Sequence, residues 1–138
     1  MQLSARVSSR YQQHEVEVQT NGVAKTLTLV PKPEGYGSVV NGGELLLLAL
    51  ATCFCNDLYR EAARRGLLLD GVEVEVTGEF GAAGEPGRNF RYRARVQSGA
   101  PAAAIDELIQ HTDRVAEVHN TLRRGLEVVL QPATDEPA

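Results

Sequence analysis

The segment from residue 41 to about residue 65 constrains the fold more than any other part of the sequence. Asn41 and Glu44 have the spacing of a helix capping box, so a helix is predicted to begin here and to end before Gly66. Its first half is apolar on nearly every side, through Leu45, Leu46, Leu47, Leu48, Leu50 and Phe54. A helix that is apolar all round must be enclosed by protein. Because one small sheet gives too little cover, we expect a second copy of the chain to supply the rest, and we predict a homodimer.

Alternating apolar and polar residues predict antiparallel strands on both sides of this helix. Before the helix, the predicted strands are 2–9, 14–20 and 23–30, and a loop follows at 31–40. Asn21 and Gly22 supply the positive φ angles that a tight hairpin turn requires. After the helix, strands 72–80 and 89–97 are predicted to form a hairpin. In it, three glutamates face three arginines: Glu73, Glu75 and Glu79, and Arg91, Arg93 and Arg95.

The C-terminal third is predicted to return to helix. The spacing of its apolar residues indicates one long or two short helices over residues 101–124, with Gly125 as the terminator. A short strand at 126–130 and a disordered tail at 132–138 are expected to follow. The chain of 138 residues has the length of one domain, 1–138. We therefore predict the α+β class, with antiparallel sheet packed on a long central helix in the order β-β-β-α-β-β-α(α)-β.

The composition excludes several classes of protein. The chain has 14 Lys and Arg against 18 Asp and Glu, a net charge of −4, which argues against nucleic acid as a partner. No apolar run approaches the roughly 20 residues needed to span a bilayer, and the N-terminus lacks a signal-peptide pattern. We expect no membrane partner and a cytoplasmic location. Cys53 and Cys55 point apart on a helix and, with the histidines, match no zinc spacing, so neither a metal nor another cofactor is predicted.

The stretch NGGELLLLALATCFCNDL resembles the central helix of the OsmC/Ohr family of osmotically inducible and organic hydroperoxide resistance proteins. The strand order, the segment DGVEVEVTGEF and the later helix AEVHNTL also follow the family plan. The resemblance implies an intertwined homodimer that reduces hydroperoxides with a peroxidatic cysteine on the central helix and a resolving cysteine on the later one. Cys53 falls at the peroxidatic position. The family's activating arginine comes from the loop between the first two strands of the partner, which implies Arg10.

Two positions depart from the family pattern. Ala116 occupies the position of the resolving cysteine, and Gly43 stands where the enzymes have a glutamate, with Glu44 one residue later. A sulfenic acid formed on Cys53 would then need an external thiol to be reduced.

From the residues alone, Cys53 is either an inert side chain of the helix core or a reactive thiol. Asp57, one turn further along, would oppose formation of the thiolate. Cys55 is expected to be a core residue. The candidates for contact with the substrate are Glu44, Leu50, Phe54 and His119. Of these, Glu44 has a competing role in the capping box. His119 lies one turn beyond the position of the resolving cysteine, and we interpret it as a plain surface residue of the helix in preference to a ligand contact.

Two functions from different classes remain open. The first is a thiol peroxidase with one reactive cysteine, Cys53, that uses an external thiol as reductant and a small hydroperoxide as substrate. The alternative is a catalytically inactive homodimer that binds a small hydrophobic ligand in the interface cleft, which the presence of Ala116 and Gly43 favours. A purely structural or regulatory partner protein has no positive signal in the sequence.

Overall fold

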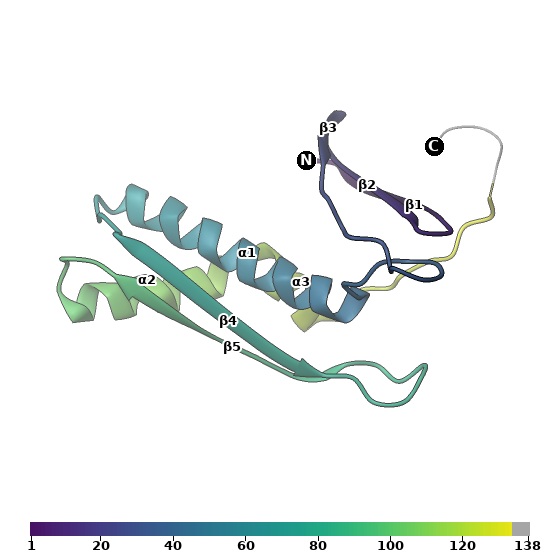
Figure 1. The fold of residues 1–138 in the computed structure, drawn as a ribbon. Coiled ribbons are helices and arrows are strands. Elements are labelled where there is room, and N and C mark those ends of the chain that lie inside the picture. The colour runs from purple at the N-terminus through teal and green to yellow at the C-terminus, as the bar shows by residue number, and fades with distance from the viewer. Residues whose placement is uncertain (134–138) are drawn as a thin grey trace. The chain divides into compact units, whose positions relative to one another are not determined.

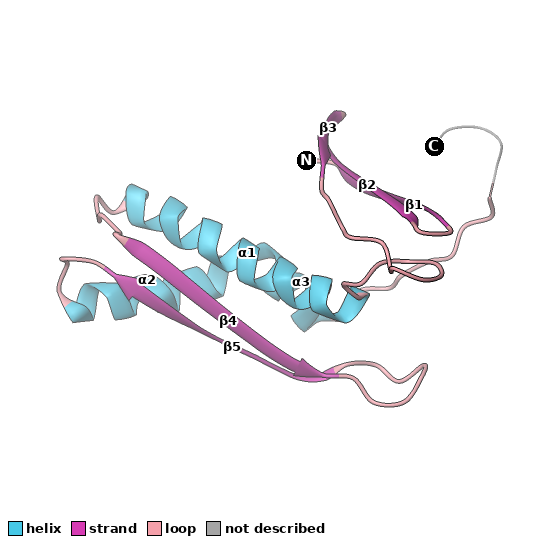
Figure 2. Ribbon diagram, viewed as in Figure 1, coloured by secondary structure: helices cyan, strands magenta, loops and turns pink. Residues whose placement is uncertain are grey.

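The computed structural model describes residues 1–133 and divides the chain into two compact units, Met1–Leu46 and Leu47–Ala138. The predicted class is confirmed, because antiparallel sheets and three helices make up the described chain (Figures 1 and 2). That the two units together form one domain, 1–138, stays a prediction. Residues 134–138 of the predicted disordered tail lie outside the described residues.

The first unit contains a three-stranded antiparallel sheet in the order β1-β2-β3. The strands are β1 (Leu3–Arg10), β2 (Gln13–Thr20) and β3 (Val23–Thr26). Asn21 and Gly22 have φ angles of 49° and 81°, as the predicted turn requires. The third strand is shorter than the predicted 23–30. Its pairing with β2 ends at Thr26, because alternation of residues along one strand does not specify how far its partner extends.

Helix α1 (Gly42–Arg64) begins with the predicted capping box. The Glu44 amide donates to Asn41 Oδ1 at 2.8 Å, and the Asn41 amide donates to Glu44 Oε1 at 3.0 Å. These reciprocal bonds satisfy two of the backbone N–H groups that a helix start leaves unpaired. The capping role of Glu44 is therefore confirmed by the structure.

In the second unit, α1 lies along a hairpin formed by β4 (Gly71–Glu79) and β5 (Arg88–Gln97), as Figure 1 shows. Helices α2 (Ala102–Val115) and α3 (Glu117–Arg124) complete this unit. The core is made of buried side chains from α1, α2 and the residue between α2 and α3: Phe54, Leu58, Ala62, Leu108 and Ala116. Apolar residues of the hairpin, among them Val74 and Tyr92, pack against this core. The unit is thus built as helices on one face of a sheet.

The opposite face of the hairpin carries the predicted pairs of charges. Arg95 lies 3.9 Å from Glu73, and Arg93 lies 3.8 Å from Glu75. The third pair is different from the prediction: Glu79 faces Arg88, at 3.5 Å, and Arg91 lies opposite Thr77. An irregularity in the strand register between Thr77 and Glu79 causes the shift.

The predicted closing strand at 126–130 is not formed. Gly125 ends α3 with a φ of 63°, as expected, but residues 126–130 have no regular structure and their leucine and valine side chains are exposed. A strand needs a neighbouring strand for its backbone hydrogen bonds, and no segment within residues 1–133 pairs with this one. None of the described helices is both long and apolar enough to cross a membrane.

Candidate functional site

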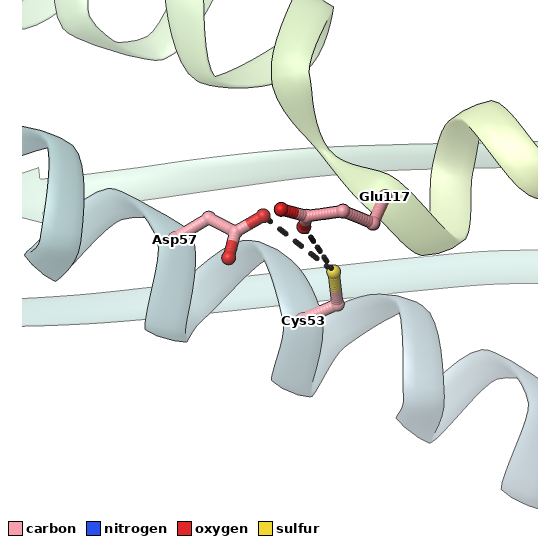
Figure 3. Close-up of side chains that lie close together, drawn as sticks. All are labelled: Cys53, Asp57 and Glu117. Carbon is pink, nitrogen blue, oxygen red and sulfur yellow. Dashed lines mark hydrogen bonds between the residues drawn. The ribbon is translucent and has the colours of Figure 1, made fainter. Parts of the chain in front are cut away.

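Cys53 lies on α1 with its sulfur close to two carboxylates (Figure 3). Sγ is 3.6 Å from Oδ2 of Asp57 and 3.8 Å from Oε2 of Glu117. Asp57 follows Cys53 by four residues on α1, so the two side chains share a helix face. Glu117 is the first residue of α3 and approaches from the other side. Cys53 as a residue is partly exposed.

The position of Glu117 follows from a break between α2 and α3. Ala116 is fully buried and has an extended backbone, with φ −69° and ψ 112°, where the two helices meet. Its small side chain fills the core beside Phe54 and Leu58. Glu117 then lies in the first turn of α3, where the partial positive charge of a helix N-terminus favours an anion.

Arg60 connects the two carboxylates. Its Nη1 lies 3.1 Å from Oδ1 of Asp57 and 3.3 Å from Oε1 of Glu117. The guanidinium therefore binds Oδ1 of Asp57 and Oε1 of Glu117, while the other oxygens, Oδ2 and Oε2, are directed toward the sulfur.

The charges at the site keep Cys53 protonated. Burial raises the pKa of its thiol, and the negative charges of Asp57 and Glu117 raise it further. The backbone N–H of Val118, in the first turn of α3, acts in the opposite direction and lowers it. Burial, with a contribution from Glu117, also raises the pKa of Asp57 to about 6. A hydrogen bond with Asp57 lowers the pKa of Glu117, so of the two acids Asp57 is the one that holds a proton below about pH 6.

Cys53, Asp57 and Glu117 also form a set of potential metal ligands. One ligand atom from each lies within 4.8 Å of the others. A thiolate with two carboxylates suits a divalent transition metal. Arg60 already contacts the other oxygen of each carboxylate and offsets one of their two negative charges, so the acids have less charge to offer a cation. The sequence predicts no metal, and that prediction stays untested.

An apolar cavity of about 230 Å³ lies between α1, α3 and the hairpin, and neither Cys53 nor its two acids are among its lining residues. Its lining includes Leu50, Val76, Phe90, Leu122 and His119. His119 is only 4% exposed, which corrects its interpretation as a plain surface residue. It lies on α3, three residues after the buried Ala116 that precedes this helix.

The imidazole of His119 is enclosed by aromatic rings and lacks hydrogen-bond partners. Its ring centre lies 4.5 Å from that of Tyr92 and 5.5 Å from that of Phe54. Neither ring nitrogen has a partner among the described residues. Burial and the nearby Arg123 lower the pKa of His119, which favours the neutral imidazole.

The structure brings together some of the predicted site residues but not others. Leu50 lines the cavity, and Phe54 is fully buried beneath it against His119. The Glu44 carboxylate is engaged in the cap of α1. Arg10 is the last residue of β1 in the first unit, and its role beside Cys53 stays a prediction.

Sequence reasoning missed Arg60 and Glu117 as members of the site. Arg60 was available from helical spacing, because it follows Asp57 by three residues on α1. Glu117 lies on a different element, and no local pattern connects it with Cys53. Cys55, predicted as a core residue, is partly exposed beside Ala51 and Val74.

Comparisons with known proteins agree with the resemblance in the sequence. The family model described as OsmC-like protein matches residues 35–131. An OsmC-like protein from Mycoplasma pneumoniae has a similar crystal structure, with 19% identity, a TM-score of 0.60 and coverage of 87% of each chain. An organic hydroperoxide resistance protein from Legionella pneumophila is similar at 19% identity and a TM-score of 0.55, covering 89% of this chain and 90% of that one.

A hydroperoxide resistance protein from Jannaschia is similar at 14% identity and a TM-score of 0.57, covering 98% of this chain and 93% of that one. At these identities the likeness concerns the fold. No curated protein sequence matches the chain. The family match covers well over half of the residues, and on that basis the chain belongs to the OsmC-like protein family.

Proposed function

We propose that this protein is a thiol-dependent hydroperoxide reductase in which Cys53 reacts with the substrate. The observation that carries the proposal is the position of a partly exposed thiol on α1, beside the N-terminus of α3, in a chain of the OsmC-like family. Two of the similar structures are described as hydroperoxide resistance proteins, which supports the same chemistry here.

The reaction needs one thiol from the protein and a second from outside. The Cys53 sulfur attacks the O–O bond of a hydroperoxide, the bond breaks, and the products are an alcohol and a sulfenic acid on Cys53. Ala116 offers no sulfur at the start of α3, so no internal disulfide forms there. A small thiol then condenses with the sulfenic acid, and a second molecule of that thiol releases reduced Cys53. We place this cycle in the cytoplasm, where such thiols stay reduced.

The apolar cavity is proposed to hold the organic part of the hydroperoxide. Leu50 and His119 line it, with Phe54 packed behind the imidazole. A cavity of about 230 Å³ is larger than the roughly 150 Å³ apolar cavity that accommodates benzene. We propose alkyl or aryl hydroperoxides of that size as substrates.

We further propose that the protein acts as a homodimer in which Arg10 of one subunit approaches Cys53 of the other. Large apolar side chains that a single chain leaves exposed support this proposal, among them Leu3, Val7, Leu48 and Val128. The two leucines of α1 provide a matched test, since Leu48 is 56% exposed and Leu50 is 5% exposed. Leu48→Asp should give a folded monomer in sedimentation, whereas Leu50→Asp should unfold the chain by burying an unpaired charge. Sedimentation of the unmodified protein as a monomer at micromolar concentration would contradict the dimer.

The direct test of function is mass spectrometry after treatment with an organic hydroperoxide. The unmodified protein should gain one oxygen, or a thiol adduct when a small thiol is added. Cys53→Ser should abolish the gain, Cys55→Ser should leave it intact, and Arg10→Ala should slow it. If Cys53 stays reduced in excess hydroperoxide, the proposal fails and binding of a hydrophobic ligand becomes the better explanation of the cavity.

A further inference from the structure

We infer that Asp57 is a catalytic residue of the proposed reaction: its carboxylate takes the proton of the Cys53 thiol and returns it to the oxygen that leaves. This inference rests on the proposed function, because the hydroperoxide supplies the oxidant. It assigns a second protein group to the chemistry, in addition to the sulfur.

The geometry distinguishes Asp57 from the other acid at the site. The thiol donates toward Oδ2 of Asp57 at 3.6 Å, a contact between groups one turn apart on the same helix. The Asp57 side chain is 7% exposed, and Arg60 holds its other oxygen at 3.1 Å. Glu117 is slightly further from the sulfur, at 3.8 Å, and its side chain is 65% exposed. Asp57 is therefore the acid with the more fixed position beside the sulfur.

The step balances without any further reagent. The proton moves from Sγ to Oδ2 of Asp57, and the resulting thiolate attacks the distal oxygen of the hydroperoxide. As the S–O bond forms, the O–O bond breaks and its electron pair stays with the departing alkoxide oxygen. That oxygen takes the proton from Asp57 and leaves as an alcohol. Sulfur is oxidised by two electrons, the peroxide is reduced by two, and Asp57 ends as it began.

The surroundings of Asp57 suit a group that accepts and then releases a proton. The facing charged groups are Arg60 on α1 and Glu117 on α3. Glu61 on α1 and His111 on α2 are connected to Asp57 only through Arg60. Glu61 forms ion pairs with both Arg60 and His111. With its pKa raised to about 6, Asp57 is mostly ionised at neutral pH and is still a far better proton acceptor than an ordinary carboxylate.

A purely electrostatic role for Asp57 predicts a different result from proton transfer. The negative charge of Asp57 raises the pKa of the thiol, so Asp57→Asn should lower that pKa and speed any reaction of the thiolate. Alkylation by iodoacetamide is such a reaction and needs no proton for its leaving group. Cleavage of a hydroperoxide does need one. The same substitution should therefore move the two rates in opposite directions.

The experiment compares both rates in a Cys55→Ser background, so that Cys53 is the only thiol. In Asp57→Asn, alkylation at pH 7 should become several-fold faster, and oxidation by an organic hydroperoxide should become roughly 100-fold slower. Glu117→Gln is the comparison variant: it also removes a negative charge near Sγ but keeps Asp57, so alkylation should rise. Because Glu117 helps to raise the pKa of Asp57, hydroperoxide cleavage should change by far less than the roughly 100-fold loss expected for Asp57→Asn. If Asp57→Asn raises both rates, Asp57 acts through its charge alone and the inference is wrong.

The pH dependence of the unmodified protein provides a second test that needs no variant. Proton transfer to Asp57 predicts that the hydroperoxide rate rises through about pH 6 and then levels off, while alkylation continues to rise with the ionisation of the thiol. Parallel profiles for the two reactions would refute the inference. A failure of the proposed function looks different, because the hydroperoxide would then leave Cys53 unmodified while alkylation proceeds.

Discussion

The raised pKa of Asp57 makes the stability of the fold depend on pH, and Asp57→Asn isolates that dependence. The pKa rises from 3.8 to about 6, a difference of about 2 units, and each unit corresponds to about 1.4 kcal/mol. An acid with a raised pKa in the folded state binds its proton more tightly there. Its contribution to stability is complete below about pH 4 and is lost as the pH rises through about 6. The loss amounts to about 3 kcal/mol.

In Asp57→Asn this loss is absent, because an amide does not ionise. The free energy of unfolding of the variant should therefore equal that of the unmodified protein near pH 4 and exceed it by about 3 kcal/mol at pH 7.5. Glu61 and Asp113 have lowered pKa values and lose stability at low pH, but both proteins contain them, so their contributions cancel in the difference. Glu117 does not cancel, because its pKa is lowered by the hydrogen bond with Asp57, and the measured difference belongs to this pair of acids.

Urea denaturation followed by circular dichroism between pH 4 and pH 7.5, at one fixed protein concentration, measures this difference. Asp106→Asn, at an exposed position of α2, is the matched control and should change stability by less than about 0.5 kcal/mol. A difference for Asp57→Asn that is flat across the pH range, or that falls as the pH rises, would refute the reasoning.

Three further substitutions test the packing and the helix start by the same denaturation assay. Phe54→Ala should cost about 3–5 kcal/mol, because the ring is fully buried against Tyr92 and His119, whereas Phe80→Ala, at a residue 52% exposed, should cost less than about 1.5 kcal/mol; equal costs would contradict the assigned core. Asn41→Ala should cost about 1 kcal/mol by removing the cap of α1, and no loss would show that the helix start does not depend on it. His119→Leu should stabilise the fold by about 1–2 kcal/mol, since both buried ring nitrogens lack partners; a loss of stability would mean that they are hydrogen-bonded in solution.

Features that depend on neighbouring residues were predictable from the sequence. The Asn41 and Glu44 cap, the Asn21 and Gly22 turn and the termination of α3 at Gly125 all follow from side chains within a few positions of the structure that they form. Each is confirmed, because the backbone conformation at such positions is decided locally.

Features that depend on distant partners were not predictable in the same way. The alternation of residues 126–130 is that of a strand, but a strand exists only where another segment accepts its hydrogen bonds. The charged cluster at Cys53 was also only partly predictable, because one of its members comes from a distant segment of the chain. Arg60 and Asp57 are local to one helix, whereas Glu117 reaches them only because the buried Ala116 breaks the path between α2 and α3. A search for helical neighbours of Cys53 finds half of this site and misses the other half.

The charge balance at Cys53 limits how the sulfur is activated. Arg60 is the cation of the cluster, and within residues 1–133 it forms ion pairs with Asp57, Glu61 and Glu117. The thiol thus faces two acids that share one cation, which contacts the oxygens that do not face the sulfur. Two routes to the thiolate remain. In the first, a cation from outside this cluster stabilises the thiolate, and we propose Arg10 of the partner subunit for this role. In the second, the thiol proton moves to Asp57.

These two routes are separable by one comparison. Stabilisation by Arg10 changes the thiol pKa, so Arg10→Ala should slow alkylation and hydroperoxide cleavage by the same factor. Transfer to Asp57 matters only where a leaving oxygen needs a proton, so Asp57→Asn should slow hydroperoxide cleavage while alkylation becomes faster. The first substitution changes the pKa of the thiol, and the second removes the group that gives a proton to the leaving oxygen. If both routes operate together, the rate of hydroperoxide cleavage in the double variant should fall by the product of the two single factors.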